Sequence, residues 1–444
     1  LVNLAGAGSQ FAVLDGASLN DVSVLVFGST GSIVFDANST SVVTPGAVVL
    51  GGVGTPTQGT ITVQGNVSAL SAPAGLFLLT ARDGSQAIDL QGRLTNSTGL
   101  FVSTGAGDDY INVYESAQLL GGSTGSRLID GGSGFDTLTF VPVTGAGGQL
   151  DVNTTGVESL LVDGNLTLGG THEFDQVRVS ARLAVGALES LGNAGGQIEL
   201  VSGSTLSIDL SSNNSNAQTA LSQRLFGSGS LEFTGIRKAS LTGDNSAFGG
   251  NVRIGASSSI GITDAGQTGS GAVTVDGQVR FEGGGDFAFL NTIAGGGALF
   301  FDGTGAVTLG TNNDAYTGFL QINSGTVVVA GSQSTGSGDL SIETPATLRI
   351  DSGAQDSQLL NRLDGSGTLV KRGTGTTTLA GGSNFNGTAR IEQGALRVGL
   401  VDDLGALPAD VSAGAALILD YNDTSPLVVN TLINGQGQFI KEGS

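Results

Sequence analysis

The chain of 444 residues contains no cysteine, no methionine and no tryptophan, and it has only one histidine. Without cysteine it cannot form a disulfide, a thiolate metal centre or a cysteine nucleophile. A single histidine excludes any site that needs two imidazole ligands from one chain. Proline is also scarce, at 7 residues, and the glycines keep no three-residue period, so the sequence is not collagen-like.

Basic residues are few as well. Lysine and arginine together number 17 against 38 aspartates and glutamates, which gives a formal net charge of −21. A surface of this sign repels phosphate backbones and anionic lipids, so we expect no nucleic-acid partner. No apolar run is long enough to cross a bilayer as a helix, so we expect no membrane insertion of this segment.

Glycine, by contrast, is abundant at 76 residues, and it separates short runs of alternating apolar residues. Runs such as 60–63, 326–329 and 347–350 are too short for helices and suit strands. Segments 181–191 and 218–226 are the best candidates for helices. The sequence therefore predicts an almost entirely β structure.

A long internal repeat occupies the second half of the chain. Its marker is a G-x-G motif followed by an apolar residue, and the second glycines of the four copies are Gly229, Gly297, Gly367 and Gly437. They lie 68, 70 and 70 residues apart. An aromatic residue follows 18 or 19 residues after the first three of these glycines, at Phe248, Tyr316 and Phe385. Self-similarity on this scale indicates a stacked array of units.

A repeat of this length favours a right-handed parallel β-helix, a solenoid in which about three coils of 20–25 residues fill one repeat. Propeller blades would repeat at roughly 40–50 residues, and tandem sandwiches at roughly 100. Parallel crossovers are nearly always right-handed. We expect the aromatic side chains of the repeat to enter the apolar interior, with the Tyr316 hydroxyl reaching a polar partner or solvent.

One stretch is distinctive enough to compare with a known family. Residues 365–399 read GSGTLVKRGTGTTTLAGGSNFNGTARIEQGALRVG, which resembles an autotransporter-associated β-strand repeat. Lys371 and Lys441 match the lysine of that pattern, whereas Phe233 and Phe301 occupy its place in earlier copies. The resemblance covers about residues 220–444. It divides the chain into irregular β-helix coils (1–100), coils with acidic turns (101–222) and the repeats (223–444, the last one truncated).

The resemblance implies the passenger domain of a Gram-negative autotransporter, exported by type V secretion through a C-terminal β-barrel translocator in the full-length protein. We interpret the chain as an internal segment of a longer exported protein, located at the bacterial cell surface or secreted. The implied role is a non-catalytic scaffold for adhesion or self-association, in biofilm or virulence, whose repeats aid secretion. Its partners would be other copies of itself or host and bacterial surface molecules. The alternative is a carbohydrate-active β-helix enzyme, or a stalk that carries a catalytic module elsewhere in the full chain.

Two segments resemble calcium-binding nonapeptides, at 105–111 and 131–138. Their aspartates, Asp109 and Asp136, are the candidate metal ligands, because Ca²⁺ prefers carboxylate and carbonyl oxygens. The simpler interpretation is a pair of Asp-Gly turns at β-helix corners, since a calcium roll needs consecutive nonapeptides. Apart from this calcium site, the sequence predicts no cofactor.

Three further patterns carry weak signals for catalysis. Residues 121–125 match the G-x-S-x-G spelling of a serine nucleophile turn, but the only possible base is His172, which we expect to be a surface or turn residue. The acidic pairs Asp108/Asp109 and Asp402/Asp403 do not converge, because adjacent strand residues point to opposite faces. The sequence therefore predicts no catalytic residue.

Overall fold

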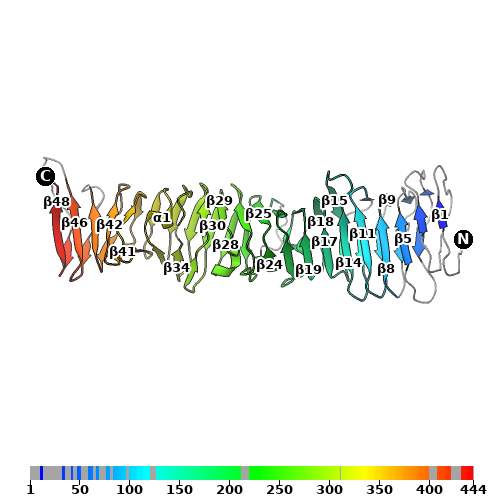
Figure 1. Cartoon of the computed structure of the whole chain (residues 1–444), viewed down its shortest axis with the longest axis horizontal. Helices are drawn as coiled ribbons and strands as arrows, with labels where there is room; N and C mark the ends of the chain where they lie inside the picture. Colours follow the sequence, from blue (N-terminus) through cyan, green and yellow to red (C-terminus); the bar gives the residue numbers. More distant parts are fainter. Residues whose placement is uncertain are drawn as a thin grey trace. The chain divides into compact units, whose positions relative to one another are not determined.

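The computed structural model describes residues 84–96, 100–120, 127–211, 220–310, 312–399, 408–421 and 432–443, together with seven short strands between residues 11 and 80. Nearly all described elements are short strands, drawn as arrows in Figure 1. By internal contacts the chain divides into two compact units, Leu1–Leu231 and Glu232–Ser444, which are called unit 1 and unit 2 below.

Unit 1 is built of parallel sheets whose neighbouring strands come from successive coils. Its longest sheet has ten strands: β1 (Phe11–Val13), β2 (Ile33–Phe35), β5 (Gly59–Val63), β8 (Gln86–Leu90), β11 (Tyr110–Tyr114), β14 (Thr137–Val141), β17 (Ser159–Val162), β19 (Gln176–Val179), β21 (Gln197–Leu200) and β24 (Arg224–Gly227). A five-stranded sheet comprises β4 (Val48–Gly51), β7 (Phe77–Thr80), β10 (Leu100–Ser103), β13 (Arg127–Asp130) and β16 (Asn153–Thr155). A four-stranded sheet comprises β3 (Val42–Val43), β6 (Val67–Ala69), β9 (Arg93–Asn96) and β12 (Gln118–Leu120). The other elements are β15 (Gly148–Asp151), β18 (Leu166–Gly169), β20 (Arg182–Val185), η2 (Leu188–Leu191), β22 (Thr205–Asp209) and β23 (Ala220–Leu221).

Unit 2 begins within β25 (Ser230–Thr234) and contains four sets of parallel strands, each named here after its first complete strand in the unit. The β27 sheet comprises β27 (Asn251–Ile254), β29 (Val273–Val275) and β32 (Ile293–Ala294). The β26 sheet comprises β26 (Lys238–Leu241), β28 (Ser259–Ile262), β30 (Gln278–Phe281), β33 (Ala298–Phe301), β35 (Phe319–Ile322), β37 (Leu340–Ile342) and β40 (Leu363–Gly365). The β31 sheet comprises β31 (Phe287–Phe289), β34 (Ala306–Leu309), β36 (Thr326–Val329), β38 (Thr347–Asp351), β41 (Thr368–Arg372), β43 (Thr388–Ile391), β45 (Ala409–Val411) and β47 (Ile433–Gly435). The β39 sheet comprises β39 (Ser357–Leu359), β42 (Thr376–Leu379), β44 (Ala395–Val398), β46 (Ala416–Asp420) and β48 (Gln438–Glu442), and two short helices are η3 (Ala265–Thr268) and α1 (Ser332–Thr335).

Alternating side chains build the core of each unit. In β19, Val177 and Val179 are buried while Gln176 and Arg178 are exposed. Parallel register places the inward residues of successive coils directly above one another, and one such column of unit 1 is Ile88, Ile111, Leu138, Leu160, Val177, Ile198 and Leu225. Every coil thereby buries its apolar face against its neighbours, while its backbone groups bond along the stack. The predicted parallel β-helix is confirmed.

The 70-residue repeat of unit 2 consists of three coils plus one additional strand, which forms an extra side of the solenoid. Three coils carry the chain from Leu299 to Leu363 through strands of the same β26 sheet. The next leucine of the repeat motif, Leu369, lies on the β31 sheet, and its counterpart Phe439 lies on the β39 sheet. The extra side is supplied by β31 in one repeat and by β39 in the next. Equivalent residues of consecutive repeats therefore occupy successive sheets instead of one column.

The two predicted helices were wrong in most of their length. Segment 181–191 forms strand β20 and only then the single 3₁₀ turn η2. The described part of segment 218–226 falls in strands β23 and β24. Pairing with the coils on either side outweighs local helix propensity at these positions. Among the described residues, no helix has the length and apolar character needed to cross a membrane.

Candidate functional sites

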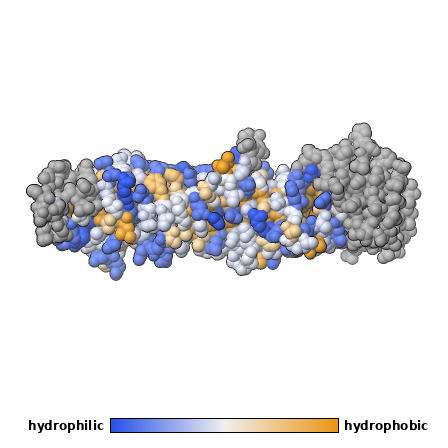
Figure 2. Space-filling view, turned by 90° about the horizontal axis from the view of Figure 1, so that it is seen from above, coloured by the Kyte–Doolittle hydropathy of each residue, from blue (hydrophilic) through white to orange (hydrophobic). Residues whose placement is uncertain are grey.

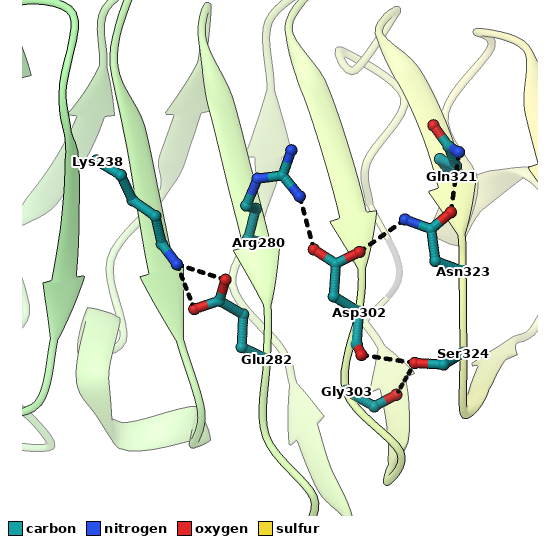
Figure 3. Close-up of polar contacts among 8 residues, drawn as sticks. All are labelled: Lys238, Arg280, Glu282, Asp302, Gly303, Gln321, Asn323 and Ser324. Atoms are coloured by element: carbon teal, nitrogen blue, oxygen red, sulfur yellow. Dashed lines mark hydrogen bonds and ion pairs between the residues drawn. The ribbon is translucent and has the colours of Figure 1, made fainter.

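Polar side chains on the outer face of the β26 sheet are linked from coil to coil (Figure 3). Lys238 of β26 donates to both carboxylate oxygens of Glu282, the residue after β30, and reaches it across the intervening strand β28. Gly261 of β28 makes this possible, because a Cβ atom there would lie 2.6 Å from Glu282 Oε2 and 2.8 Å from Lys238 Cε. The missing side chain is thus what allows the ion pair to form.

The same face continues in a second polar cluster (Figure 3). Arg280 donates to Asp302 Oδ2 at 2.7 Å, and its guanidinium carbon lies 4.3 Å from the centre of the Phe300 ring. Asp302 Oδ1 accepts a bond of 2.6 Å from the amide of Asn323, whose own oxygen accepts one of 2.9 Å from Gln321. Lys238 and Arg280 are therefore both paired with acids of other coils. On the face seen in Figure 2, hydrophilic and intermediate residues predominate, and hydrophobic residues form only small separate patches.

The two predicted calcium ligands lie together in unit 1. The backbone N–H of Asp109 donates to Asp136 Oδ1 at 2.8 Å, and both carboxyl groups are fully buried. One coil here is 27 residues long, so the spacing that separates the two nonapeptide-like segments also stacks them. Asp108, by contrast, is exposed, as expected for its opposite orientation, and accepts from the backbone N–H of Phe135 at 2.9 Å.

The next coil extends this arrangement, because Glu158 Oε2 accepts from the backbone N–H of Asp136 at 2.8 Å. Burial, together with the negative charges of Asp109, Glu158 and Asp108, raises the pKa of Asp136 to about 7, although the bond from the Asp109 N–H opposes the shift. Asp136 Oδ2 accepts no hydrogen bond. A neutral carboxyl group is therefore the form that this position favours at mildly acidic pH.

Glycines allow the corners that carry these acids. Gly132 has φ +91°, and a Cβ atom there would lie 1.7 Å from the carbonyl oxygen of Gly105 in the preceding coil.

Among the described residues, no group of three or more His, Cys, Asp and Glu side chains is placed to hold a metal ion. The calcium site at Asp109 and Asp136 therefore stays a prediction.

A surface or turn residue was expected at His172; it does lie between strands β18 and β19, but its side chain is buried instead of exposed. Its ring stacks on Phe174 with centroids 4.7 Å apart, Nδ1 lies 3.1 Å from the Thr154 hydroxyl, and Nε2 lies 3.1 Å from the carbonyl oxygen of Gly169. Since a carbonyl can only accept, Nε2 carries the proton and Nδ1 accepts from Thr154. Burial lowers the pKa of His172 to about 4. The ring thus stabilises a coil corner as a neutral side chain.

Two sequence motifs fall outside the described residues: the G-x-S-x-G stretch at 121–125 and the acidic pair Asp402/Asp403. The structure gives no account of either. His172, the only base that a serine nucleophile could use, has both ring nitrogens within hydrogen-bonding distance of Thr154 and Gly169.

The repeated aromatic residues lie in the interior, as predicted. Phe248 and Phe385 are 1% exposed, and Tyr316 is fully buried. The Tyr316 hydroxyl lies 2.8 Å from the carbonyl oxygen of Phe319 and 3.0 Å from that of Gly297, so it has polar partners. These rings are therefore core residues, which excludes an exposed aromatic ladder at the repeat positions.

Sequence reasoning missed the orientation of Lys371. This side chain is fully buried in β41, in register with Ile350 and Ile391 of the adjacent coils. Its ammonium group donates to the carbonyl oxygens of Arg372 at 2.5 Å and Gly373 at 2.8 Å. Burial lowers its pKa, against the raising effect of Asp351 and Asp356. The signal in the sequence was the exchange of lysine with phenylalanine between repeats.

A second feature that the sequence did not reveal is a groove in unit 2. Its volume is about 790 Å³, and it is bounded by α1, by the turn after β38 and by the first strands of the β39 sheet. Hydroxyl and amide side chains dominate its lining, and its charged residues are Asp351, Asp356 and Arg397. Its position and chemistry make it a candidate binding site.

Comparisons with known proteins give one informative match. The chain is 32% identical over 155 residues to the protein named Adhesin BmaC autotransporter of Brucella suis biovar 1 (strain 1330), a match that covers 32% of this chain and 4% of that protein. No protein-family model matches, and no solved structure matches. The assignment of residues 220–444 to the autotransporter-associated repeat therefore stays a prediction. The match and the parallel β-solenoid together support a region similar to an autotransporter passenger.

Proposed function

We propose that this chain is an adhesin-like, non-catalytic segment of an autotransporter passenger, displayed at the bacterial surface or secreted. The observation that carries the proposal is the match to a protein named an autotransporter adhesin in a chain that folds as a parallel solenoid. The partners that we propose are other copies of the chain and surface molecules of host or bacterial cells. A role of the repeats in secretion belongs to the same proposal.

The adhesive mechanism would be distributed along the coils. Outer faces present hydroxyl, amide and carboxylate groups at regular intervals, as in the cluster around Asp302 (Figure 3). Each contact of this kind is weak, because it replaces bonds to water. Many such contacts on one rigid scaffold act together, since the first contact raises the effective concentration of the next.

A bead assay tests the proposal. Microspheres coated with the chain are flowed over glass coated with the chain, over bacterial cells and over cultured mammalian cells, with spheres carrying an acidic globular protein as control. We expect retention of the coated spheres on at least one surface at physiological salt. Retention no better than the control on all three surfaces would contradict adhesion, and release of reducing sugar ends from a polysaccharide panel would contradict the non-catalytic assignment.

A further inference from the structure

The groove of unit 2 lies where the repeat changes sides. In one coil the chain passes from β36 into the helix α1, whereas in the next coil it passes from β38 through a turn into the extra strand β39. The groove lies between the helix of one coil and the extra strand of the next. The outward residues Gln358 of β39 and Thr378 of β42 are among those that line it.

The preceding repeat has the same framework. Asp286 and Asp356 stand directly before the extra strands β31 and β39, and each accepts from the first backbone N–H of a strand in the next coil, at 2.7 Å in both cases. Asn291 and Asn361 follow these strands, and both are buried and bonded to glycine carbonyls of the preceding coil. The aspartate before the extra strand and the asparagine after it are therefore common to both repeats.

The lining of the groove is not common to them. Four positions that are apolar in the first repeat are polar in the second, namely Phe287 to Ser357, Ala288 to Gln358, Ala306 to Thr376 and Val328 to Arg397. Since the same fold accommodates both sets, the architecture does not require polar residues at these places. The change points to a ligand.

Unused hydrogen-bonding groups converge on the groove. In the part of the chain that the structure describes, the side-chain amides of Gln333, Gln355 and Gln358 make no hydrogen bond to the protein, and all three line the groove. The hydroxyl of Thr378 is likewise unused. Each amide offers an acceptor oxygen beside donor hydrogens, an arrangement that can bind two neighbouring hydroxyl groups at once.

The charged groups of the groove are already engaged. Arg397 donates to Asp420 Oδ2 at 3.1 Å and to Glu442 Oε2 at 2.7 Å, and Asp356 Oδ1 accepts from the Thr376 N–H. An anionic ligand would meet the carboxylates of Asp351 and Asp356, and an apolar ligand would find no aromatic or large aliphatic side chain in the lining. A neutral ligand rich in hydroxyl groups fits these constraints.

We propose that this groove binds a neutral oligosaccharide. The inference rests on the proposed function, because it names what an adhesive surface of this chain would hold. Gln358 and Thr378 would contact the sugar hydroxyls from the floor, and Gln333 and Gln355 from the two walls.

Saturation-transfer NMR and titration calorimetry on the whole chain test the inference. The probes are maltotriose, cellotriose and N,N′,N″-triacetylchitotriose, with a heparin-derived tetrasaccharide as the anionic counterpart, all in the presence of chelator. We expect at least one neutral trisaccharide to bind. Gln358→Ala or Thr378→Ala should weaken that binding about fivefold to tenfold, because each removes a hydrogen-bonding group. The matched control is Gln278→Ala, an exposed outward glutamine of β30 away from the groove.

Each outcome of these experiments decides the inference. Binding of no neutral probe, tighter binding of the heparin tetrasaccharide, or equal affinity of the wild-type chain and both groove variants would overturn it. Circular dichroism melts show whether the variants are folded. We expect the melting temperature to stay unchanged, because both substitutions replace outward side chains on strands. Adhesion of wild-type beads without any sugar binding would remove the groove proposal and keep the proposed function. Sugar binding in solution without bead adhesion would remove the proposed function and keep the groove as a sugar-binding site.

Discussion

Asp136 and His172 of unit 1 are buried in forms that are neutral at mildly acidic pH. Burial raises the pKa of Asp136 to about 7 from an ordinary 3.8, and burial lowers the pKa of His172 to about 4 from an ordinary 6.5. Among the described residues, neither side chain pairs with an opposite charge; their hydrogen bonds are to backbone and hydroxyl groups. The two groups therefore act on stability in the same pH range.

The two contributions to stability should depend on pH in opposite directions. Folded Asp136 keeps its proton up to about pH 7, whereas the unfolded chain loses it near pH 4, so this group's contribution to stability falls as the pH rises from about 4 to 7. The unfolded chain protonates His172 below about pH 6.5, whereas the folded protein does so only near 4, so this contribution rises with pH across that interval.

Single substitutions should separate the two effects. Asp136→Asn keeps the acceptor for the Asp109 N–H, and the unfolding free energy of unit 1 should then increase from pH 4.5 to 6.5 more steeply than in wild type. His172→Gln should reverse the trend. Urea unfolding followed by tryptic protection of unit 1 measures both, with Asp163→Asn as an exposed control. The same slope in all variants would show that these groups do not titrate as described.

Calcium binding at Asp109 and Asp136 is tested by titration. If both carboxyl groups bind Ca²⁺, chelator-treated protein should release heat on addition of millimolar Ca²⁺ and unfold at a higher temperature. Asp136→Asn should abolish both effects, whereas Asp163→Asn should leave them unchanged. Absence of heat and of any melting shift would leave these aspartates as hydrogen-bonding residues of a β-helix corner.

Lys371 tests whether a buried ammonium group is needed at all. Lys371→Met keeps the length of the side chain and removes the desolvated charge, so the free energy of unfolding should change by no more than about 1 kcal/mol or should rise. Lys371→Ala leaves a cavity between Ile350 and Ile391 and should cost about 2–5 kcal/mol. Chemical denaturation of both variants compares them. A methionine variant as unstable as the alanine variant would show that bonds to the Arg372 and Gly373 carbonyls are essential.

At the scale of the strands, the sequence was sufficient for the fold because local pattern and repeat agree. Alternation in runs such as 347–350 identified strands, and the spacing of Gly297 and Gly367 identified the stack. The groove could not be predicted, because it arises from which residues of different coils face each other. The length of each coil sets that register, and this length differs between coils: Thr347 lies 21 residues after its partner Thr326, whereas Leu363 lies 23 residues after its partner Leu340. The burial of Lys371 was indicated in the sequence only by the exchange of lysine with phenylalanine between repeats.

Two buried asparagines join successive coils in unit 2 by an identical set of contacts. The amide nitrogen of Asn361 donates to Gly336 O and Gly338 O at 3.3 and 2.7 Å, and its oxygen accepts from the Thr335 hydroxyl at 2.6 Å. Asn291 makes the same three contacts to Thr268, Gly269 and Gly271, at 3.3, 3.0 and 2.7 Å. These contacts hold the coil that contains the additional strand, β31 or β39, against the coil before it.

Loss of this contact should destabilise unit 2 strongly. Asn361→Leu preserves volume but leaves two carbonyls and a hydroxyl buried without their partner, and it should cost about 2–5 kcal/mol. Thr335→Val in the same chain should restore part of the loss, because it removes one of the unpaired groups. Urea denaturation of the single and double variants measures the coupling. Asn384→Ala, at an exposed position nearby, should change stability by less than about 0.5 kcal/mol; strict additivity of the first two substitutions would contradict the contact.

For the whole molecule, the stacking of coils limits how far a defect spreads. Each coil bonds to the coil before it and the coil after it, so stability is approximately a sum of terms between neighbours. Phe174 of unit 1 and Phe385 of unit 2 are both 1% exposed, so each alanine substitution should cost about 3–5 kcal/mol. The loss should stay within the unit that carries the substitution.

Limited proteolysis with mass spectrometry measures where each variant opens. Phe385→Ala should create new cleavage sites near residues 365–399 while the fragments of unit 1 stay as protected as in wild type. Phe174→Ala should open unit 1 and leave unit 2 protected, and the double variant should show the sum of both patterns. New cleavage in both units from either single substitution would mean that the chain unfolds as one cooperative block. Coupling between adjacent coils predicts instead that the effect of a defect at Phe385 declines with each coil away from it, because every coil passes on only part of the destabilisation.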